Sequence, residues 1–388
     1  MPKLLTRRFT LAWLANLSQA MAWALFIHFP GFLLGLGASE VEIGLLIGLT
    51  ALASVVVRPW VGRAMDVYGR RPVIIVGNLG NIATLTLYLT VTGLGPWIYV
   101  VQILHGFATA LLFTSLFTYG ADQVPSARRT EGLALFGVSG LLPIALGGLL
   151  GDIILGAGPF THLFLTALGF AGFALLLSLP LHDAPRGTSV PLRFWASVTA
   201  PDLQPLWWLT FVFAVALTAY FTFLKTFVVE TGIGSVGAFF AAYSGIAIAL
   251  RLFAGSLPDR VGQMKVLYPA LASATIGFVV LALAGSGTAV VVAGLLCGTG
   301  HAYAFPIMLA LVVTRSRKAD RGSAIAIFTG LFDLGALIGA PALGAAIHFG
   351  SYQTMFFTAA AWTLLGTAVF AHWDRRRERA RPSTSAPT

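Results

Sequence analysis

Long apolar runs separated by short polar loops dominate the chain. Twelve runs reach the roughly 20 residues that a helix needs to cross a hydrocarbon core about 30 Å thick. They cover residues 10–36, 42–61, 73–93, 97–118, 132–155, 160–181, 205–230, 236–254, 266–285, 289–313, 323–348 and 352–373. We therefore predict an all-α membrane protein with twelve transmembrane helices.

One polar cassette occurs twice, 193 residues apart, and each copy lies between two apolar runs. Residues 58–71 read RPWVGRAMDVYGRR, and residues 251–265 read RLFAGSLPDRVGQMK. Four positions of the first copy align without a gap with four of the second: Arg58, Gly62, Asp66 and Gly69 with Arg251, Gly255, Asp259 and Gly262. A duplication of this kind predicts two pseudo-symmetric bundles of six helices.

The same pattern predicts the domain boundaries. The two bundles are expected at residues 1–181 and 205–373. Residues 182–204 are the only long polar stretch between them, which indicates a cytoplasmic linker. Residues 374–388 are basic at first and then rich in Ser, Thr and Pro, so we predict a disordered cytoplasmic tail there.

Composition supports the membrane assignment. Hydrophobic residues make up 57% of the 388 residues, charged residues only 10%, and the mean hydropathy is +0.86. Soluble domains usually carry about 25% charged residues, because their surface faces water. A chain with so few charges is expected to expose its surface to lipid, with the lipid bilayer as its main partner.

Basic residues predict the orientation. Of 24 Lys and Arg, only Lys225 lies away from the two chain ends and one set of alternate loops. The positive-inside rule therefore places both termini in the cytoplasm and makes the chain a multi-pass protein of the inner (plasma) membrane. The net charge of +10 follows from this topology. Nucleic-acid binding is not expected, because the charges are spread over loops that apolar helices separate.

Several classes of function lack their chemistry here. The sequence has no Gly-x4-Gly-Lys-Ser/Thr loop for ATP and no His-Glu-x2-His zinc motif. Its single cysteine, Cys297, allows neither a disulfide within the chain nor a thiolate metal cluster. We expect no enzyme activity, no metal and no cofactor apart from a coupling proton, and we expect a monomer that binds a small-molecule substrate.

Two six-helix halves, each with a Gly-x3-Asp-x2-Gly cassette after its second helix, resemble the major facilitator superfamily. The resemblance covers essentially the whole chain and includes YGADQVP (119–125), GTGHAYAFP (298–306) and RGSAIAIFTGLFDLG (321–335). It points to the bacterial, twelve-helix branch that resembles drug/proton antiporters. It implies transport of a small molecule by alternating access.

The resemblance also implies a cytoplasmic gate at the cassettes. Arg70 is expected to reach Asp122 at the end of the fourth helix, and Asp66 to pair with an arginine or with the positive N-terminal end of a helix. The alternative is that these charges only fix topology, and for Arg58 and Arg251 that they extend towards water. The candidate gate residues are Arg58, Gly62, Asp66, Gly69, Arg70, Asp122, Arg251, Gly255, Asp259 and Arg260.

The fifth predicted span, residues 132–155, carries small residues that resemble the antiporter motif of the family, Gly-x3-Gly-Pro-x2-Gly-Gly. The matching residues are Gly137, Gly140, Pro143, Gly147 and Gly148. Leu142 takes the usual glycine place before the proline, and the spacing to the glycine pair is one residue longer. The motif implies export by antiport, whereas small residues on a membrane helix also simply allow close packing.

The resemblance implies that the first, fourth, seventh and tenth predicted spans line a central cavity. These are residues 10–36, 97–118, 205–230 and 289–313. Ionisable groups inside a membrane are costly, which makes each of them a functional candidate. The substrate or coupling candidates on these helices are His28, Gln102, His105, Lys225, His301 and Tyr303. Gln102 replaces an arginine that the family associates with proton coupling. A buried histidine can instead be a neutral hydrogen-bonding partner, and Lys225 can pair with Glu230.

Asp333 is the acid that we place deepest in the membrane. It lies about eleven residues into the eleventh predicted span, residues 323–348. At about 1.5 Å per residue, this is near the middle of the membrane. A carboxyl group there could take up a proton near neutral pH, as proton coupling requires. The competing role is a fixed ion pair or a hydrogen bond between helices.

The first functional hypothesis is a secondary active transporter that exports an amphipathic compound in exchange for protons. The second is uptake or exchange of a small organic anion, which the cationic candidates His28, His105, Lys225 and His301 favour and Asp333 opposes. The third is a receptor or scaffold on a transporter fold. The duplicated gate charges argue against the third, because a protein that no longer changes conformation has no use for them.

Overall fold

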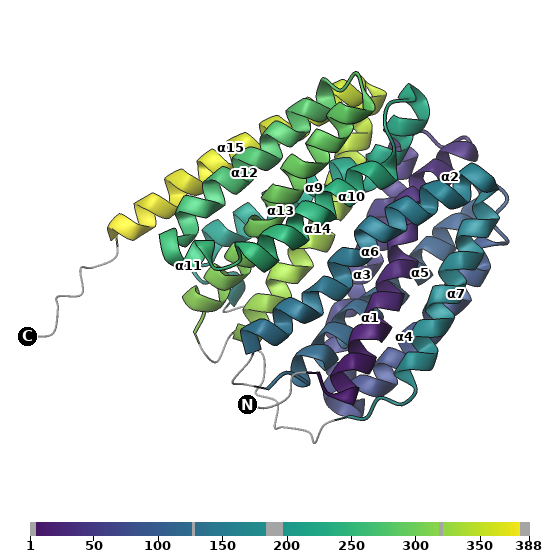
Figure 1. Ribbon diagram of the computed structural model, residues 1–388, viewed down its shortest axis with the longest axis horizontal. Coiled ribbons are helices and arrows are strands. Elements are labelled where there is room, and N and C mark those ends of the chain that lie inside the picture. Colours follow the sequence, from purple (N-terminus) through teal and green to yellow (C-terminus); the bar gives the residue numbers. More distant parts are fainter. Residues whose placement is uncertain (1–4, 126–128, 184–196, 318–320, 381–388) are drawn as a thin grey trace, which may run out of the picture.

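The computed structural model describes residues 5–125, 129–183, 197–317 and 321–380, and these contain helices but no strand. The helices pack side by side as long rods (Figure 1). The start of α1 and the end of α15 lie at the same end of the molecule, at the lower left of Figure 1. We call this the near end and the opposite one the far end. Most of the predicted linker, residues 184–196, lies outside the described residues.

In the part of the chain that the structure describes, the first half forms seven α-helices and one 3-10 turn. They are α1 (Arg7–Leu25), η1 (Phe26–His28), α2 (Phe29–Gly35), α3 (Glu40–Tyr68), α4 (Arg70–Tyr88), α5 (Pro96–Asp122), α6 (Arg129–Ala157) and α7 (Phe160–Ser178). The second half forms seven more. They are α9 (Gln204–Thr231), α10 (Val236–Phe253), α11 (Leu257–Val261), α12 (Gln263–Ala282), α13 (Gly287–Arg315), α14 (Arg321–His348) and α15 (Tyr352–Ala380).

Side-chain caps fix where several helices begin. At α3 the Ser39 hydroxyl accepts a hydrogen bond from the Glu42 N–H at 3.3 Å, and the Glu42 carboxylate accepts one from the Ser39 N–H at 2.9 Å. This capping box satisfies two backbone donors that a helix start leaves free. Ser235 and Ser286 cap α10 and α13 in the same way through their hydroxyls.

The first apolar run is not one continuous helix. We predicted a single span over residues 10–36, but η1 separates α1 from α2. Pro30 lies in the first turn of α2, where its missing N–H is tolerated, although the same ring would disrupt a helix interior. The break places His28 in the short turn between the two helices.

Eleven helices of the described chain are long and apolar enough to cross a membrane, where twelve were predicted. The third predicted span, α4, is not among them. It begins with Arg70 and Arg71 and carries Asn78 and Asn81, which lower its hydropathy. Both asparagines are buried, and the Asn81 amide donates to the Gln19 Oε1 at 3.2 Å. The polar residues of α4 therefore face helices of the same half, and α4 packs on α5 and α7.

The last helix is longer than predicted. We expected residues 374–388 to be disordered, but α15 continues through Ala380. Two nitrogens of the Arg315 guanidinium donate to the Asp374 carboxylate, at 2.5 and 3.1 Å, which holds this extension against α13. The prediction of a disordered tail is therefore wrong up to Ala380, and residues 381–388 lie outside the described part.

The two halves of the chain meet along two helix pairs, α3 with α14 and α6 with α10. Glycines allow close approach in both. A Cβ on Gly44 would overlap the Ala340 carbonyl oxygen, and one on Gly148 would lie 3.3 Å from the Phe240 Cβ. Membrane helices lack a strong hydrophobic drive to associate, so backbone contacts of this kind supply much of their packing.

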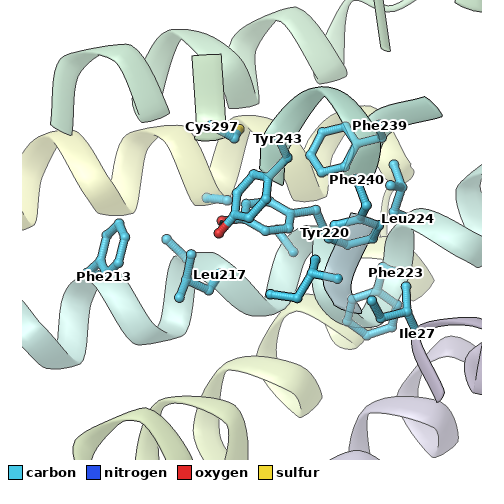
Figure 2. Packing of buried hydrophobic residues seen from close by; sticks show 14 of the residues in the cluster. Ile27, Phe213, Leu217, Tyr220, Phe223, Leu224, Phe239, Phe240, Tyr243 and Cys297 are labelled. Carbon is cyan, nitrogen blue, oxygen red and sulfur yellow. Dashed lines mark hydrogen bonds between the residues drawn. The ribbon is translucent and has the colours of Figure 1, made fainter. Parts of the chain in front are cut away.

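The largest buried cluster fills the second half and reaches into the first. Figure 2 shows Tyr220 of α9 and Tyr243 of α10 with their hydroxyl groups together, 3.4 Å apart. Phe239 and Phe240 pack around them, and Ile27 of η1 approaches from the other half. Rings of this size contribute most of the dispersion contacts in a core.

Substituting Gly44 tests the close packing of α3 on α14. We expect Gly44→Ala to lower stability by about 1–3 kcal/mol, because the added methyl group forces two backbones apart. Gly172→Ala is the matched control, since no heavy atom lies within 4 Å of a Cβ there. Thermal unfolding in detergent should show a lower Tm for the first variant only. Equal melting of both variants would contradict this packing.

Candidate transport site

The first cassette forms a charged contact at the near end. The Arg70 Nε donates to the Asp122 Oδ2 at 3.1 Å, and the Arg70 Nη1 donates to the Met65 carbonyl at 3.3 Å. This is the Arg70–Asp122 contact that the sequence predicts. Its role in a gate stays a prediction. Asp66 lies in α3, but its side chain lies outside the described part of the structure.

The last glycine of each cassette has the same conformation. Gly69 and Gly262 have φ of 96° and 103°, in a region that residues with a side chain rarely adopt. Each joins two helices by a sharp turn, α3 to α4 and α11 to α12. The two copies thus share backbone geometry as well as sequence.

An acid that the sequence analysis overlooked completes the first turn. One Asp183 oxygen accepts the backbone N–H groups of Arg70 and Arg71, both at 2.9 Å. A Cβ on Gly69 would overlap the Asp183 carboxylate, so the glycine is needed for space as well as for φ. Asp183 thereby caps α4 from the end of the first bundle. It lies 113 residues from Arg70, and no local signal could have identified it.

The second cassette differs before its turn. Here α10 ends at Phe253, and residues 254–256 form a non-helical turn before the short α11. In contrast, α3 continues as a helix past Gly62. The Tyr303 hydroxyl donates to the Ala254 carbonyl at 3.3 Å, which satisfies a group that the break leaves free. Tyr303 therefore has a structural partner.

Two other members of the second cassette are unpaired. Asp259 and Arg260 are exposed, and no described residue forms an ion pair with either. Among the residues that the structure describes, only the first copy therefore has an ion pair at its charged turn, so the predicted gate is asymmetric there.

The ion pair between Arg58 and Asp333 joins the two halves. The Arg58 Nη2 lies 2.6 Å from the Asp333 Oδ2, and the side chains are 17% and 22% exposed. The Ser54 hydroxyl donates to the same oxygen at 3.1 Å, and the Arg58 Nη1 donates to the Thr329 hydroxyl at 3.3 Å. The sequence analysis placed these two charges in separate sets, as a gate residue and as a coupling residue. The structure brings them together between α3 and α14.

A second polar cluster joins the halves at the far end. His28 donates through Nε2 to the Gly148 carbonyl at 3.1 Å, and its Nδ1 lies 3.8 Å from Asp152. The Asp152 Oδ2 accepts the backbone N–H of Gly237, in the first turn of α10, at 2.6 Å. A carboxylate in this position interacts favourably with the positive end of the helix. The sequence analysis missed Asp152, because it lies within three residues of the end of its predicted span.

Lys225 belongs to this far-end cluster. Its stem packs over Gly31 of α2, where a Cβ would lie 2.9 Å from the Lys225 Cγ. The Asp152 carboxylate lies near enough to attract the Lys225 ammonium group. No ion pair joins it to Glu230 among the described residues, so the alternative partner that the sequence suggested is not used.

The glycines of the fifth predicted span, which is α6 in the structure, divide into two groups. A Cβ on Gly147 would overlap Ala24 of α1, and Gly148 faces α10. In contrast, a Cβ on Gly137 or Gly140 would meet no heavy atom within 4 Å. Gly147 and Gly148 therefore pack closely on neighbouring helices, whereas Gly137 and Gly140 have open space beside their Cα atoms.

Gln102 and His105 lie inside the first half. The Gln102 Oε1 accepts hydrogen bonds from Thr50 at 2.6 Å and from Tyr88 at 2.9 Å. The Tyr88 hydroxyl also lies 3.0 Å from the His105 Nδ1, and the His105 ring packs on Phe26. This network links α3, α4 and α5 and buries both candidates. One group of this network stays unsatisfied, because the Gln102 Nε2 is buried without a hydrogen-bond partner among the described residues.

His301 occupies a third setting, in the second half. Its ring lies 5.7 Å from the rings of Phe213, Tyr243 and Phe305, and its Nδ1 is buried without a hydrogen-bond partner. The four basic candidates thus do not converge on one point. His28 and Lys225 share the far-end cluster, while His105 and His301 lie in different halves.

The comparisons with known proteins agree with this architecture. The sequence matches the profile of the Major Facilitator Superfamily over residues 11–316 and 235–387. The chain belongs to this superfamily. It is a membrane transporter and not an enzyme, and the functional question becomes what it carries and how the passage is coupled.

Similar proteins include both relatives and solved structures of transporters. The chain is 25% identical over 370 residues to the MFS-type transporter YhhS of Salmonella enteritidis, covering 92% of this chain and 89% of the relative. The nucleoside transporter NupG superposes with a TM-score of 0.78 at 14% identity, over 95% and 99% of the two chains. The human organic anion transporter MFSD10 gives 0.71 at 17%, over 95% and 100%. At these identities the structures establish the fold alone.

A double-mutant cycle measures the coupling of Arg58 to Asp333. We expect Arg58→Gln and Asp333→Asn each to lower stability, by up to about 3–5 kcal/mol, because each leaves a mostly buried charge without its partner. The double variant should lose less than the sum of the two. Thermal unfolding in detergent measures all four proteins, with the exposed Arg63→Gln as a control. Strict additivity would mean that the two residues do not interact.

Hydrogen exchange tests the far-end contact. Asp152→Asn removes the negative charge that binds the Gly237 N–H, so amides at the start of α10 should exchange several-fold faster. Mass spectrometry of peptides covering residues 233–242 reports this directly. Asp259→Asn, at an exposed acid, serves as the control. Unchanged exchange in the Asp152 variant would show that the contact does not hold the two halves together.

Proposed function

We propose that the protein is a proton-coupled secondary transporter that moves a small organic molecule by alternating access. One observation carries this proposal: an ion pair between Arg58 and Asp333 joins α3 of the first half to α14 of the second. Alternating access requires the halves to separate and meet again on either side of a substrate. A carboxylate that holds them together is a suitable place for a proton to act.

The chemistry of the pair supports coupling. Protonation of Asp333 removes the negative charge that compensates Arg58, and a buried charge without a partner is unstable. The guanidinium would then move towards water or towards Thr329, and α3 and α14 could part. Ser54 can accept a hydrogen bond from the protonated carboxyl as readily as it donates one to the carboxylate.

The topology forms part of this proposal. We propose α4 as the twelfth span, because it packs on α5 and α7 and its asparagines face neighbouring helices. We also propose two six-helix bundles, at residues 1–181 and 205–373, in a monomer of the inner membrane. The concentration of Arg and Lys in alternate loops and at the chain ends supports a cytoplasmic near end.

Export of an amphipathic compound is the first candidate for the direction and substrate. Trp23 of α1 is 43% exposed and lies 6.1 Å from Phe221 of α9, in the other half. Aromatic side chains of this kind suit a molecule with an apolar body. The small residues of α6 support antiport through their resemblance to the family motif.

Uptake or exchange of a small organic anion is the second candidate. Arg251 of α10 favours it, because this half-buried cation has no acidic partner among the described residues. A receptor or scaffold without transport is the third hypothesis, and the cross-half ion pair argues against it.

Transport into inverted, energised membrane vesicles tests the proposal. We expect accumulation of at least one compound from a panel of lipophilic cations, neutral drugs and organic anions, with collapse when a protonophore is added. Asp333→Asn should remove the pH dependence of this transport, because the amide carries no proton for exchange. Arg63→Gln, at an exposed residue outside the candidate gate set, controls for loss of a surface charge.

Two results would contradict the proposal. Transport by the Asp333 variant with a normal pH profile would exclude this carboxyl as the coupling group. Absence of any accumulation or exchange with folded protein present, in either orientation of the vesicles, would contradict transport by this mechanism.

A further inference from the structure

The internal repeat predicts a second ion pair, between Arg251 and an acid of the first half, which is absent from the described residues. Arg58 and Arg251 are equivalent positions of the two cassettes, and Arg58 pairs with Asp333 of the other half. Subtracting the repeat distance of 193 from 333 gives position 140, which is Gly140 on α6. The first half therefore offers no carboxylate where the repeat would place the partner of Arg251.

The side chain of Arg251 is correspondingly unsatisfied. It is half-buried, and its Nε is fully buried without a hydrogen-bond partner. No ion pair or hydrogen bond joins its guanidinium to any residue that the structure describes. Removing one partner of a buried ion pair normally destabilises a protein strongly, so an arginine kept in this state calls for a ligand or a function.

The register of the helices places Arg251 beside open space. α6 and α10 run antiparallel, with Gly148 against Phe240 at their far halves. Continuing this register along both helices brings Arg251 level with the segment of α6 that contains Gly137 and Gly140. A Cβ on either glycine would meet nothing within 4 Å. A cation and an unfilled space thus occupy the position at which the equivalent helix pair holds an ion pair.

Aromatic groups border the same region. The ring of His301 packs on that of Tyr243, which lies eight residues before Arg251 on α10, and the buried His301 Nδ1 has no partner among the described residues. The rings of Phe213 and Phe305 flank His301, and Phe305 also packs on Phe332 at 5.3 Å. A ligand at Arg251 therefore has a polar nitrogen and a wall of rings within its reach.

We propose that Arg251 anchors the substrate, and that the substrate is an organic anion with an aromatic or other apolar body. Its carboxylate supplies the counter-charge that the first half lacks, so binding completes a second ion pair between the halves. Its apolar part packs on the rings around His301. This inference rests on the proposed transport function and names the chemical class of its substrate.

Ligand-induced stabilisation of purified protein provides the test, and benzoate is the probe. A ligand that binds only the folded state raises its stability according to its affinity and concentration. We expect benzoate at millimolar concentration to raise the Tm of the wild type by about 2 °C or more in chloride-free buffer. Benzamide, the neutral analogue of the same shape, and chloride, an anion without an apolar body, should each have a much smaller effect.

Two pairs of variants identify the site. Arg251→Gln should abolish the response to benzoate, while Arg251→Lys, which keeps the charge, should retain part of it. Gly140→Asp supplies the missing carboxylate, so it should raise the Tm without ligand and abolish the benzoate response. Gly140→Asn, its uncharged match, should do neither. If Arg251→Gln fails to fold, the higher Tm expected for Gly140→Asp still tests the site.

The outcomes separate this inference from the transport function. No benzoate response in the wild type, an equal response to benzamide or to chloride, or an unchanged response in Gly140→Asp would each overturn the anion site. The binding assay needs no proton gradient, so any of these results leaves the vesicle experiment to decide transport. Benzoate binding at Arg251 in a protein whose transport ignores Asp333 would preserve the site and overturn the coupling.

Discussion

The ion pair between Arg58 and Asp333 is the interaction on which the account of this transporter depends. A charge inside a membrane protein is tolerated only when another group compensates it. Here the two charges come from opposite halves of the chain and lie 2.6 Å apart. Each half therefore neutralises a charge of the other half whose burial would otherwise be unfavourable. The same dependence makes the contact reversible, because neutralising one carboxyl removes the reason for the halves to stay together at this point.

The two helix pairs between the halves use the repeat in different ways. α3 and α14 are joined by glycine contacts at the far end and by the ion pair nearer to the termini. α6 and α10 keep the glycine contacts and add the Asp152–Gly237 bond at the far end, and no described acidic side chain lies opposite Arg251. The α3–α14 pair thus has both partners of its ion pair within the protein. In the proposed mechanism, a substrate anion supplies the missing partner of the α6–α10 pair, so the two equivalent helix pairs have different functions.

The sequence was sufficient for the helical class and the repeat, because apolar run length and cassette spacing are local properties. The contact between Arg70 and Asp122 was expected only from the resemblance to the superfamily. The sequence did not predict that Arg58 and Asp333 meet, since they are 275 residues apart and their register depends on how two bundles pack. Asp183 was missed because it binds backbone groups of a distant helix, and Asp152 because it lies near the end of its predicted span. The helical extension at Asp374 depends on a pairing with Arg315 that hydropathy does not encode.

Distance measurements between spin labels at positions 67 and 325 test the central claim most directly. Both residues are exposed, they lie near the near ends of α3 and α14, and Cys297→Ala removes the only competing thiol. The account predicts that the distance between the labels lengthens as pH falls, and that Asp333→Asn shows the longer distance even at neutral pH. A distance that neither pH nor this substitution changes would contradict the role of the ion pair in holding the two halves together.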